Sequence, residues 1–165
     1  MTVAEPIDSN PRASGARYGH TNLIARDWRV LADFYETVFG CVPVPPERDY
    51  RGLELEAGTG VPDAALRGVH LRLPGGGPDG PTIEIYTYET QPDTLPPAPN
   101  RPGWGHIAFV VDDVLQARAV VLASGGGAVA EVVTLQTTDG RPVTWCYMID
   151  PEGNIIELQS WAPAG

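Results

Sequence analysis

Two stretches of the chain share one pattern of polar and apolar positions. Residues 19–27 read GHTNLIARD and residues 105–113 read GHIAFVVDD, so each begins with Gly-His, continues through a strand-like run and ends with aspartate. A short run of this kind, bounded by turn-forming residues, is typical of a β-strand. The two stretches are 86 residues apart, which indicates an internal repeat and predicts a first strand for each of two similar halves.

A helical pattern follows each of these strands. In the first half, Asp27 is a candidate N-cap and Gly40 a candidate stop. The apolar positions between them recur at helical spacing, at Leu31, Phe34, Tyr35 and Val38. In the second half, Asp113 and Gly125 hold the corresponding places. The apolar face there comprises Val114, Ala117, Val121 and Leu122. One helix is therefore predicted behind the first strand of each half.

Short β-rich runs separated by turn signals complete each half. In the first half we place strands near residues 52–57, 66–73 and 82–88. In the second half they fall near 128–135, 143–149 and 154–161, with DPEGN as a tight turn before the last. The order in each half is strand, helix, strand, strand, strand. The sequence thus predicts an α+β protein built from two tandem βαβββ modules.

A proline-rich segment separates the two modules. Residues 90–103 read TQPDTLPPAPNRPG, a composition typical of a linker. We therefore expect four parts, namely a flexible N-terminal tail over 1–17, a first module over 18–89, this linker and a second module over 104–162.

Composition narrows the class of function. The chain has 165 residues and is 42% hydrophobic, which is enough for a buried core. Its 21 acidic and 11 basic residues give a net charge of −10, which disfavours nucleic acids and anionic membranes as partners. All the basic residues are arginine, so Schiff-base chemistry and a P-loop, which need a lysine amine, are excluded.

The cysteines and the chain start favour a cytoplasmic protein. Cys41 and Cys146 are far apart and form no CxxC motif, so neither a zinc finger nor a disulfide framework is expected. No run approaches the roughly 18 apolar residues of a membrane span. The first residues lack the basic start and apolar core of a signal peptide.

The repeat brings two histidines and two glutamates into equivalent positions. His20 and His106 open the two first strands, while Glu84 and Glu157 lie between apolar neighbours in the closing strands TIEIYTY and IIELQSW. Two imidazoles and two carboxylates can hold a divalent ion and leave positions for water or substrate. We therefore predict a metal site made by all four residues. Nitrogen and oxygen ligands without a thiolate suit nickel, cobalt, zinc, manganese or iron.

Strand alternation names the neighbours of these four residues, because every second residue shares a face. If the glutamates and histidines point into a site, the substrate wall comprises Asn22, Tyr86, Tyr88, Gln159 and Trp161. His70 has no partner in the repeat, so we favour a structural role for it. Cys146 lies in an apolar strand without an evident base, which favours a buried thiol over a nucleophile.

These motifs resemble those of the vicinal oxygen chelate superfamily, and the ligand motifs are most similar to glyoxalase I. The stretches GHTNLIARD, TIEIYTY, GWGHIAFVVDD and DPEGNIIELQSW carry the resemblance, which spans residues 18–161. The resemblance implies paired βαβββ modules that form a cupped mixed β-sheet around a divalent metal. It also implies that His20, Glu84, His106 and Glu157 bind the metal and that one glutamate acts as a base. We choose Glu157 for that role, with Glu84 as the symmetric alternative.

The chemistry implied is proton transfer next to a metal-bound carbonyl through an enediolate, as in a lyase or isomerase. The substrate would be a small molecule with vicinal oxygens. The first half contains a long segment, residues 42–68, that cannot be matched to the glutathione-binding positions of glyoxalase I, so the thiol cofactor is unknown. We expect a homodimer, and the linker allows the metal site to form either within one chain or between two chains.

Three alternatives stay open. Methylmalonyl-CoA epimerase is built similarly but has a glutamine among its metal ligands, so Glu84 favours the glyoxalase side. Extradiol dioxygenases of the superfamily use two histidines and one carboxylate, one ligand fewer than predicted here. Antibiotic-binding resistance proteins share the fold without catalysis and generally lack the metal set, which the His/Glu quartet argues against.

Overall fold

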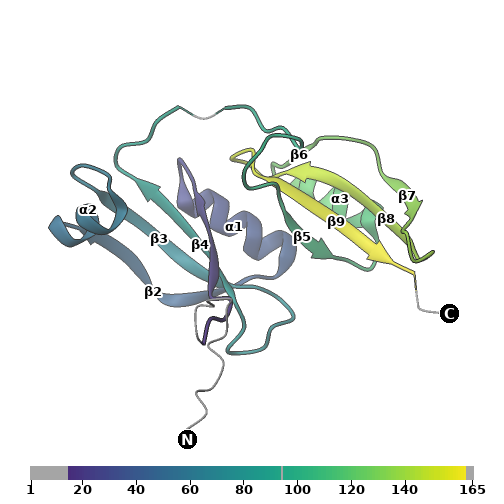
Figure 1. Ribbon diagram of the computed structural model, residues 1–165, viewed down its shortest axis with the longest axis horizontal. Coiled ribbons are helices and arrows are strands. Elements are labelled where there is room, and N and C mark those ends of the chain that lie inside the picture. Colours follow the sequence, from purple (N-terminus) through teal and green to yellow (C-terminus); the bar gives the residue numbers. More distant parts are fainter. Residues whose placement is uncertain (1–14, 94, 163–165) are drawn as a thin grey trace, which may run out of the picture.

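The computed structural model describes residues 15–93 and 95–162 and consists of two modules, each with its own sheet (Figure 1). The first module contains β1 (His20–Ile24), α1 (Trp28–Phe39), β2 (Val42–Arg51), α2 (Leu53–Thr59), β3 (Ala65–Arg72) and β4 (Thr82–Tyr88). The second contains β5 (Ile107–Val110), α3 (Val114–Ala123), β6 (Gly127–Ala128), β7 (Val133–Gln136), β8 (Pro142–Ile149) and β9 (Ile155–Trp161). The predicted α+β class is confirmed. Residues 1–14 of the predicted tail lie outside the described residues.

The two sheets repeat one topology. The strand order is β1-β4-β3-β2 in the first sheet and β5-β9-β8-β6 in the second, where β7 also pairs with β8. In both sheets the first strand pairs in parallel with the last, and the remaining neighbours are antiparallel. The repeat seen in the sequence is therefore a repeat of structure. It places His20 at the start of β1 and His106 immediately before β5, and these edge strands lie next to the strands that carry Glu84 and Glu157.

The predicted helix starts are confirmed in detail. The Asp27 side chain accepts hydrogen bonds from the backbone N–H groups of Arg29 and Val30, and α1 ends at Gly40 with φ 65°. Asp113 caps α3 in the same way, through Leu115 and Gln116. These caps satisfy backbone donors that a helix leaves unpaired at its first turn. Helix α3 ends at Ala123, and the predicted stop Gly125 follows the C-cap Ser124 with φ 89°. Leu122, however, is exposed rather than part of the packed face.

The strand predicted at 52–57 is wrong. Residues 53–59 form the short helix α2, and the strand of the module is β2, which precedes it. Leu53 and Leu55 alternate with glutamates and so mimic a strand, but the helix begins after Gly52 and ends at Gly60 in the left-handed region. No strand is predicted at 42–51, where the prolines of VPVPP are unusual for the interior of a sheet. Proline is tolerated there because β2 is the edge strand and its register shifts between Val44 and Arg48.

The single strand predicted at 128–135 is divided into β6 and β7. Ala128 pairs with Met148 and Val133 pairs with Trp145, so five steps along this segment correspond to three along β8. The segment between β6 and β7 therefore has two more residues than the matching part of β8, and these extra residues do not pair with β8, as in an extended bulge.

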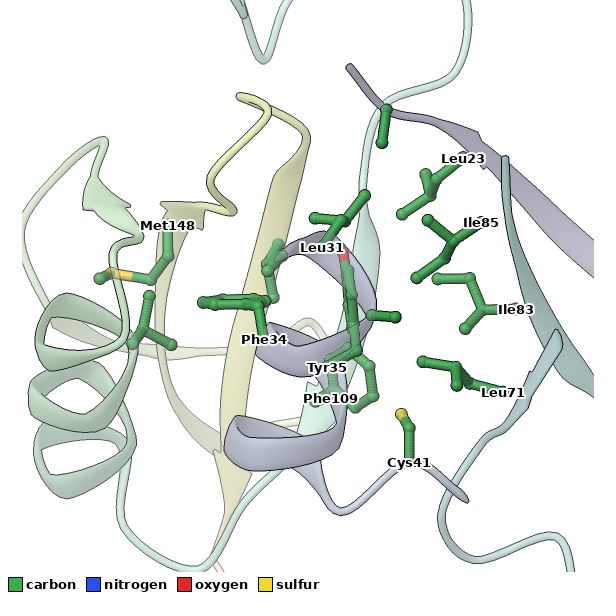
Figure 2. Packing of buried hydrophobic residues seen from close by; sticks show 14 of the residues in the cluster. Leu23, Leu31, Phe34, Tyr35, Cys41, Leu71, Ile83, Ile85, Phe109 and Met148 are labelled. Carbon is green, nitrogen blue, oxygen red and sulfur yellow. The ribbon is translucent and has the colours of Figure 1, made fainter. Parts of the chain in front are cut away.

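One hydrophobic core joins the modules. Leu23, Ile83 and Ile85 of the first sheet and Phe109 and Met148 of the second belong to a single buried cluster, with α1 packed between the sheets (Figure 2). The rings of Phe39 and Phe109 stack at 3.8 Å between centroids. Each sheet therefore turns one face toward this shared core and the other away from it. None of the helices in the described ranges is long and apolar enough to cross a membrane.

Candidate functional site

The predicted site residues lie on the sheet faces that point away from the shared core, which we call the site faces. On β1, Leu23 is buried in the core, so His20 and Asn22 share the opposite face. On β4, Ile83 and Ile85 are fully buried, so Glu84 lies on the site face. The same alternation holds in the second module, where the buried residues Phe109, Cys146 and Leu158 leave the opposite face to His106, Tyr147 and Glu157.

In the first module, Glu84 is held by three side chains. Its Oε2 lies 3.3 Å from His20 Nε2, and its Oε1 lies 3.0 Å from His70 Nε2. Asn22 Nδ2 donates a hydrogen bond to Oε2 at 3.3 Å. Because both carboxylate oxygens are engaged, Glu84 has a fixed orientation. We call these four residues the first half-site.

His70 therefore lies on the site face, in contact with Glu84. The sequence favoured a structural role for His70 and did not predict this contact. Its Nε2 also lies 2.8 Å from the Tyr86 hydroxyl. Partial burial lowers the pKa of His70, against the opposing effect of the Glu84 carboxylate. Burial raises the pKa of Tyr86 to about 12, and Glu84 acts in the same direction. The neutral forms of both side chains are therefore favoured near pH 7.

In the second module, a simpler pair occupies the equivalent position. His106 Nε2 lies 3.1 Å from Glu157 Oε2. The Tyr147 ring packs against the His106 ring at 5.2 Å, and the Trp145 ring lies 5.0 Å from Tyr147. We call His106, Glu157 and Tyr147 the second half-site. Tyr147 pairs with Glu157 as His70 pairs with Glu84, so the repeat partner of His70 is a tyrosine, which explains why the sequence comparison found no second histidine.

The two half-sites lie apart within one chain. Both sheets direct their core faces at the same buried cluster, so their site faces point outward on opposite sides of it. Across residues 15–93 and 95–162, no hydrogen bond or ion pair joins the His20–Glu84 pair to the His106–Glu157 pair. Within the same ranges, no group of three or more His, Cys, Asp or Glu side chains is arranged to hold a metal ion.

Each His–Glu pair nevertheless has the spacing of two neighbouring metal ligands. Imidazole nitrogens and carboxylate oxygens bind divalent ions at about 2.0–2.2 Å, so two of them side by side on one ion lie about 3 Å apart. The distances of 3.3 Å for His20–Glu84 and 3.1 Å for His106–Glu157 fit this spacing. The donor set of each half-site therefore fits half of a four-ligand ion site.

The predicted substrate residues lie in three places: a cavity, the first half-site and the second site face. Asn22 and Tyr88 line a cavity of about 600 Å³ between β1, the end of β4, the start of the linker and the β8–β9 turn. Tyr86 is buried beside His70, outside that cavity. On β9, Gln159 accepts a hydrogen bond from the Trp161 indole at 2.7 Å. Asn22 therefore lines the cavity and also donates a hydrogen bond to Glu84.

The sequence reasoning did not find Tyr147, Trp145 or the specific place of Arg48, all three of which lie on site faces. Alternation from Glu157 through its pairing with β8 could have found the two aromatic residues, but a sequence does not show which residues pair across strands. The two cysteines are free and buried, as expected, and burial raises the pKa of Cys146, which makes it a poor nucleophile.

Comparisons with known proteins agree with this architecture. A family model described as Glyoxalase, for the Glyoxalase/Bleomycin resistance protein/Dioxygenase superfamily, matches residues 17–158. No curated protein matches the sequence.

Several solved structures share the fold. A glyoxalase family protein from Bacillus cereus has a TM-score of 0.74 at 19% identity, over 94% of this chain and 99% of that one. A domain of the same superfamily from a Frankia species has a TM-score of 0.56 at 17% identity, over 92% and 96%. A glyoxalase I mutant from Zea mays has a TM-score of 0.61 at 16% identity, over 86% of this chain and 45% of that longer one. At these identities the likeness shows the fold alone.

Proposed function

The chain belongs to the glyoxalase/bleomycin resistance protein/dioxygenase superfamily, and from that premise we propose that it is a divalent-metal-dependent lyase or isomerase of the glyoxalase I type. It transfers a proton to or from the carbon atom next to the carbonyl group of a small molecule with vicinal oxygens. The observation that carries this proposal is the repetition of one His–Glu pair, at 3.3 Å and 3.1 Å, on the site faces of two equivalent sheets. A solvent-exposed ion pair serving stability alone would not need this symmetry.

The four residues of the two pairs would hold the ion: His20, Glu84, His106 and Glu157. When bound, a divalent ion polarises a substrate carbonyl and acidifies the adjacent C–H bond. The absence of thiolates from this set suits nickel, cobalt, zinc, manganese or iron. Two carboxylates would also balance the double positive charge of the ion.

We propose further that the ion site is shared between the two chains of a homodimer. The site faces of one chain point outward on opposite sides of its core, so its own two pairs do not converge. A two-fold dimer can bring the first half-site of one chain opposite the second half-site of its partner, and symmetry then creates two equivalent sites.

Glu157 is the better base of the two glutamates. Three side chains hold Glu84 in place, whereas His106 is the one side-chain partner of Glu157 among the described residues. A base has to turn toward the C–H bond and carry the proton between two carbon positions. Glu157 keeps the freedom to do so, while Glu84 serves better as a fixed ligand. Tyr147 and Trp145 beside this pair would shield the reacting carbon from water.

The location that suits this protein best is the cytoplasm, because both cysteines are free and buried.

Proton exchange with solvent tests the proposal. The protein is loaded with Co²⁺, its metal content is measured, and pyruvate is incubated with it in D₂O while ¹H NMR follows the methyl protons. We expect stoichiometric metal and metal-dependent deuteration of the methyl group. Glu157→Gln should slow this exchange by about 10²-fold or more, the usual effect of removing a general base.

The matched control is Glu131→Gln, an exposed glutamate between β6 and β7, which should leave exchange unchanged. Bound metal without any exchange would overturn the proposed chemistry. Absence of bound metal would overturn the metal site itself and favour a non-catalytic binding protein of the same superfamily.

A further inference from the structure

Arg48 on β2 is a fixed positive charge on the site face of the first module. It pairs across the sheet with Gly68, which pairs in turn with Tyr86 of β4. Gly68 lies on the same strand face as His70, two residues along, so Arg48 shares the face that carries the first half-site. The row formed by Arg48, Gly68 and Tyr86 lies next to the row that contains His70 and Glu84.

Gly68 creates the space in which this row packs. A Cβ atom at position 68 would lie 2.3 Å from Cδ1 of Tyr86 and 1.9 Å from the carbonyl oxygen of Ile85. The Tyr86 ring therefore covers the position where another residue would have its side chain. With its ring there, Tyr86 places its hydroxyl 2.8 Å from His70 Nε2. The glycine therefore makes room for the Tyr86 ring in the row that also contains Arg48.

Arg48 has no carboxylate partner among the described residues, whereas the acidic residues on either side of it both form ion pairs. Glu47 pairs with Arg29 at 3.0 Å. Asp49 pairs with Arg51 and Arg67, at 3.2 Å each, on the other face of the strand. Arg48 Nη1 is shielded from solvent and lacks a hydrogen-bond acceptor, although the residue as a whole is partly exposed. A buried donor without an acceptor is unfavourable, so a ligand that supplies the acceptor gains affinity by satisfying it.

The second site face carries an unpartnered donor of its own. Three buried side-chain N–H groups in the described ranges lack an acceptor, and two of them, on Arg48 and Trp145, lie on site faces. Trp145 occupies the position on β8 that Gly68 occupies on β3, opposite Gln159. Each site face therefore has a hydrogen-bond donor, on Arg48 or on Trp145, that an acceptor oxygen of a ligand could satisfy.

We infer that Arg48 binds the carboxylate of the substrate, and that the substrate class is therefore a 2-oxo carboxylate rather than a neutral carbonyl compound. This inference rests on the proposed function, because the half-sites beside Arg48 are taken to hold the ion that receives the 2-oxo group. Two glutamates balance the charge of that ion, so the negative charge of the substrate needs a separate cation. One planar guanidinium matches one carboxylate, whereas a phosphate dianion would need a second cation.

Another arginine of the first sheet provides a comparison for Arg48. Arg72, the other arginine on the site face of the first sheet, lies in the row of Thr82 and His20, on the other side of the His70–Glu84 row from Arg48. Unlike Arg48, it is not among the buried donors without an acceptor in the described residues. Arg72 is therefore the matched control for Arg48.

Calorimetric titration with two small ligands tests the inference. Pyruvate carries the carboxylate, and pyruvamide keeps the 2-oxo group without the charge. Both are titrated into metal-free and Co²⁺-loaded protein. Wild type and Arg72→Gln should bind pyruvate at least tenfold more tightly than pyruvamide. Arg48→Gln should lose that preference while its affinity for pyruvamide and for Co²⁺ stays the same. Arg48→Lys, which keeps the charge but not the fork, should retain part of the preference.

Retention of the full preference in Arg48→Gln, or its loss in Arg72→Gln, would overturn the inference. So would equal binding of the two ligands by the wild type. The titration also separates this inference from the proposed function. Failure to bind Co²⁺ would count against the ion site alone, because the Arg48-dependent preference is measured in the metal-free protein as well.

Discussion

The hydroxyl group of Tyr35 on α1 donates a hydrogen bond to Asp150 Oδ2 at 3.1 Å, across 115 residues of sequence. Tyr35 belongs to the first module, and Asp150 begins the DPEGN turn of the second. Both side chains are buried, at 0% and 1% exposed. Asp150 also accepts hydrogen bonds from the backbone N–H groups of Glu152 and Asn154 and from the Asn154 side chain. One buried carboxylate thus shapes the turn and fastens it to the first module.

Tyr35→Phe should destabilise the protein by about 1–2 kcal/mol, because it removes the hydrogen bond and leaves an acceptor on Asp150 less satisfied. Urea denaturation measures the change. Tyr50→Phe is the control, since Tyr50 is about half exposed, and it should change the free energy of unfolding by less than about 0.5 kcal/mol. Equal effects of the two substitutions would show that the Tyr35–Asp150 bond does not stabilise the joined modules.

The Asp150 carboxyl should make stability depend on pH in a direction opposite to that of a salt-bridged acid. Burial raises its pKa, and the hydrogen bonds from Asn154, Tyr35 and Glu152 oppose that rise only in part. The folded state therefore binds the proton more tightly than the unfolded state. The stabilisation from this group is present in full below the unfolded pKa, near 3.8, and is lost as pH rises through the folded pKa.

Asp150→Asn removes that contribution and serves as the reference. The difference in free energy of unfolding, wild type minus Asp150→Asn, should increase as the pH is lowered from 8 toward 4. Other titrating groups cancel in this difference. A difference that stays constant or decreases on acidification would mean that hydrogen bonding, rather than burial, dominates the pKa of Asp150.

Gly68→Ala should be strongly destabilising although alanine is small. Its Cβ would lie 1.9 Å from the Ile85 carbonyl oxygen, and backbone cannot move aside as a flexible side chain can. We expect a loss of about 1–3 kcal/mol, typical of overpacking, and a displaced Tyr86 ring. Gly58→Ala in α2 is the control with open space around its Cβ, and it should stabilise slightly through helix propensity. Thermal unfolding of both variants measures the contrast. A neutral Gly68→Ala would refute the close packing of Tyr86 on β3.

Local patterns in the sequence were sufficient for much of the fold. The apolar alternation of TIEIYTY and IIELQSW gave both the strands and the faces of Glu84 and Glu157, because a strand has one periodicity and the core selects one face. Asp27 and Asp113 marked the helix starts because an N-cap is a local interaction. The internal repeat then related the two halves without any knowledge of their contacts.

What the sequence could not provide depends on contacts between distant segments. The prolines of β2 are atypical of a strand, so the sequence revealed neither this edge strand nor the position of Arg48 on the site face. His70 looked solitary because its partner in the repeat is Tyr147, which only the pairing of β8 with β9 reveals. The outward direction of both half-sites follows from the packing of α1 between the sheets, which no periodicity encodes.

We propose that one ion is held by the His20–Glu84 pair of one chain and the His106–Glu157 pair of another. Two variants are produced together under different affinity tags, one with His20→Ala and Glu84→Gln, the other with His106→Ala and Glu157→Gln. In the mixed dimer, one site then keeps all four ligands and the other loses all four. Metal analysis of the isolated dimers is the deciding measurement. We predict two tightly bound ions per wild-type dimer, one per mixed dimer and none in either doubly substituted homodimer. A mixed dimer without metal, beside a wild-type dimer that retains two ions, would contradict a site shared between chains.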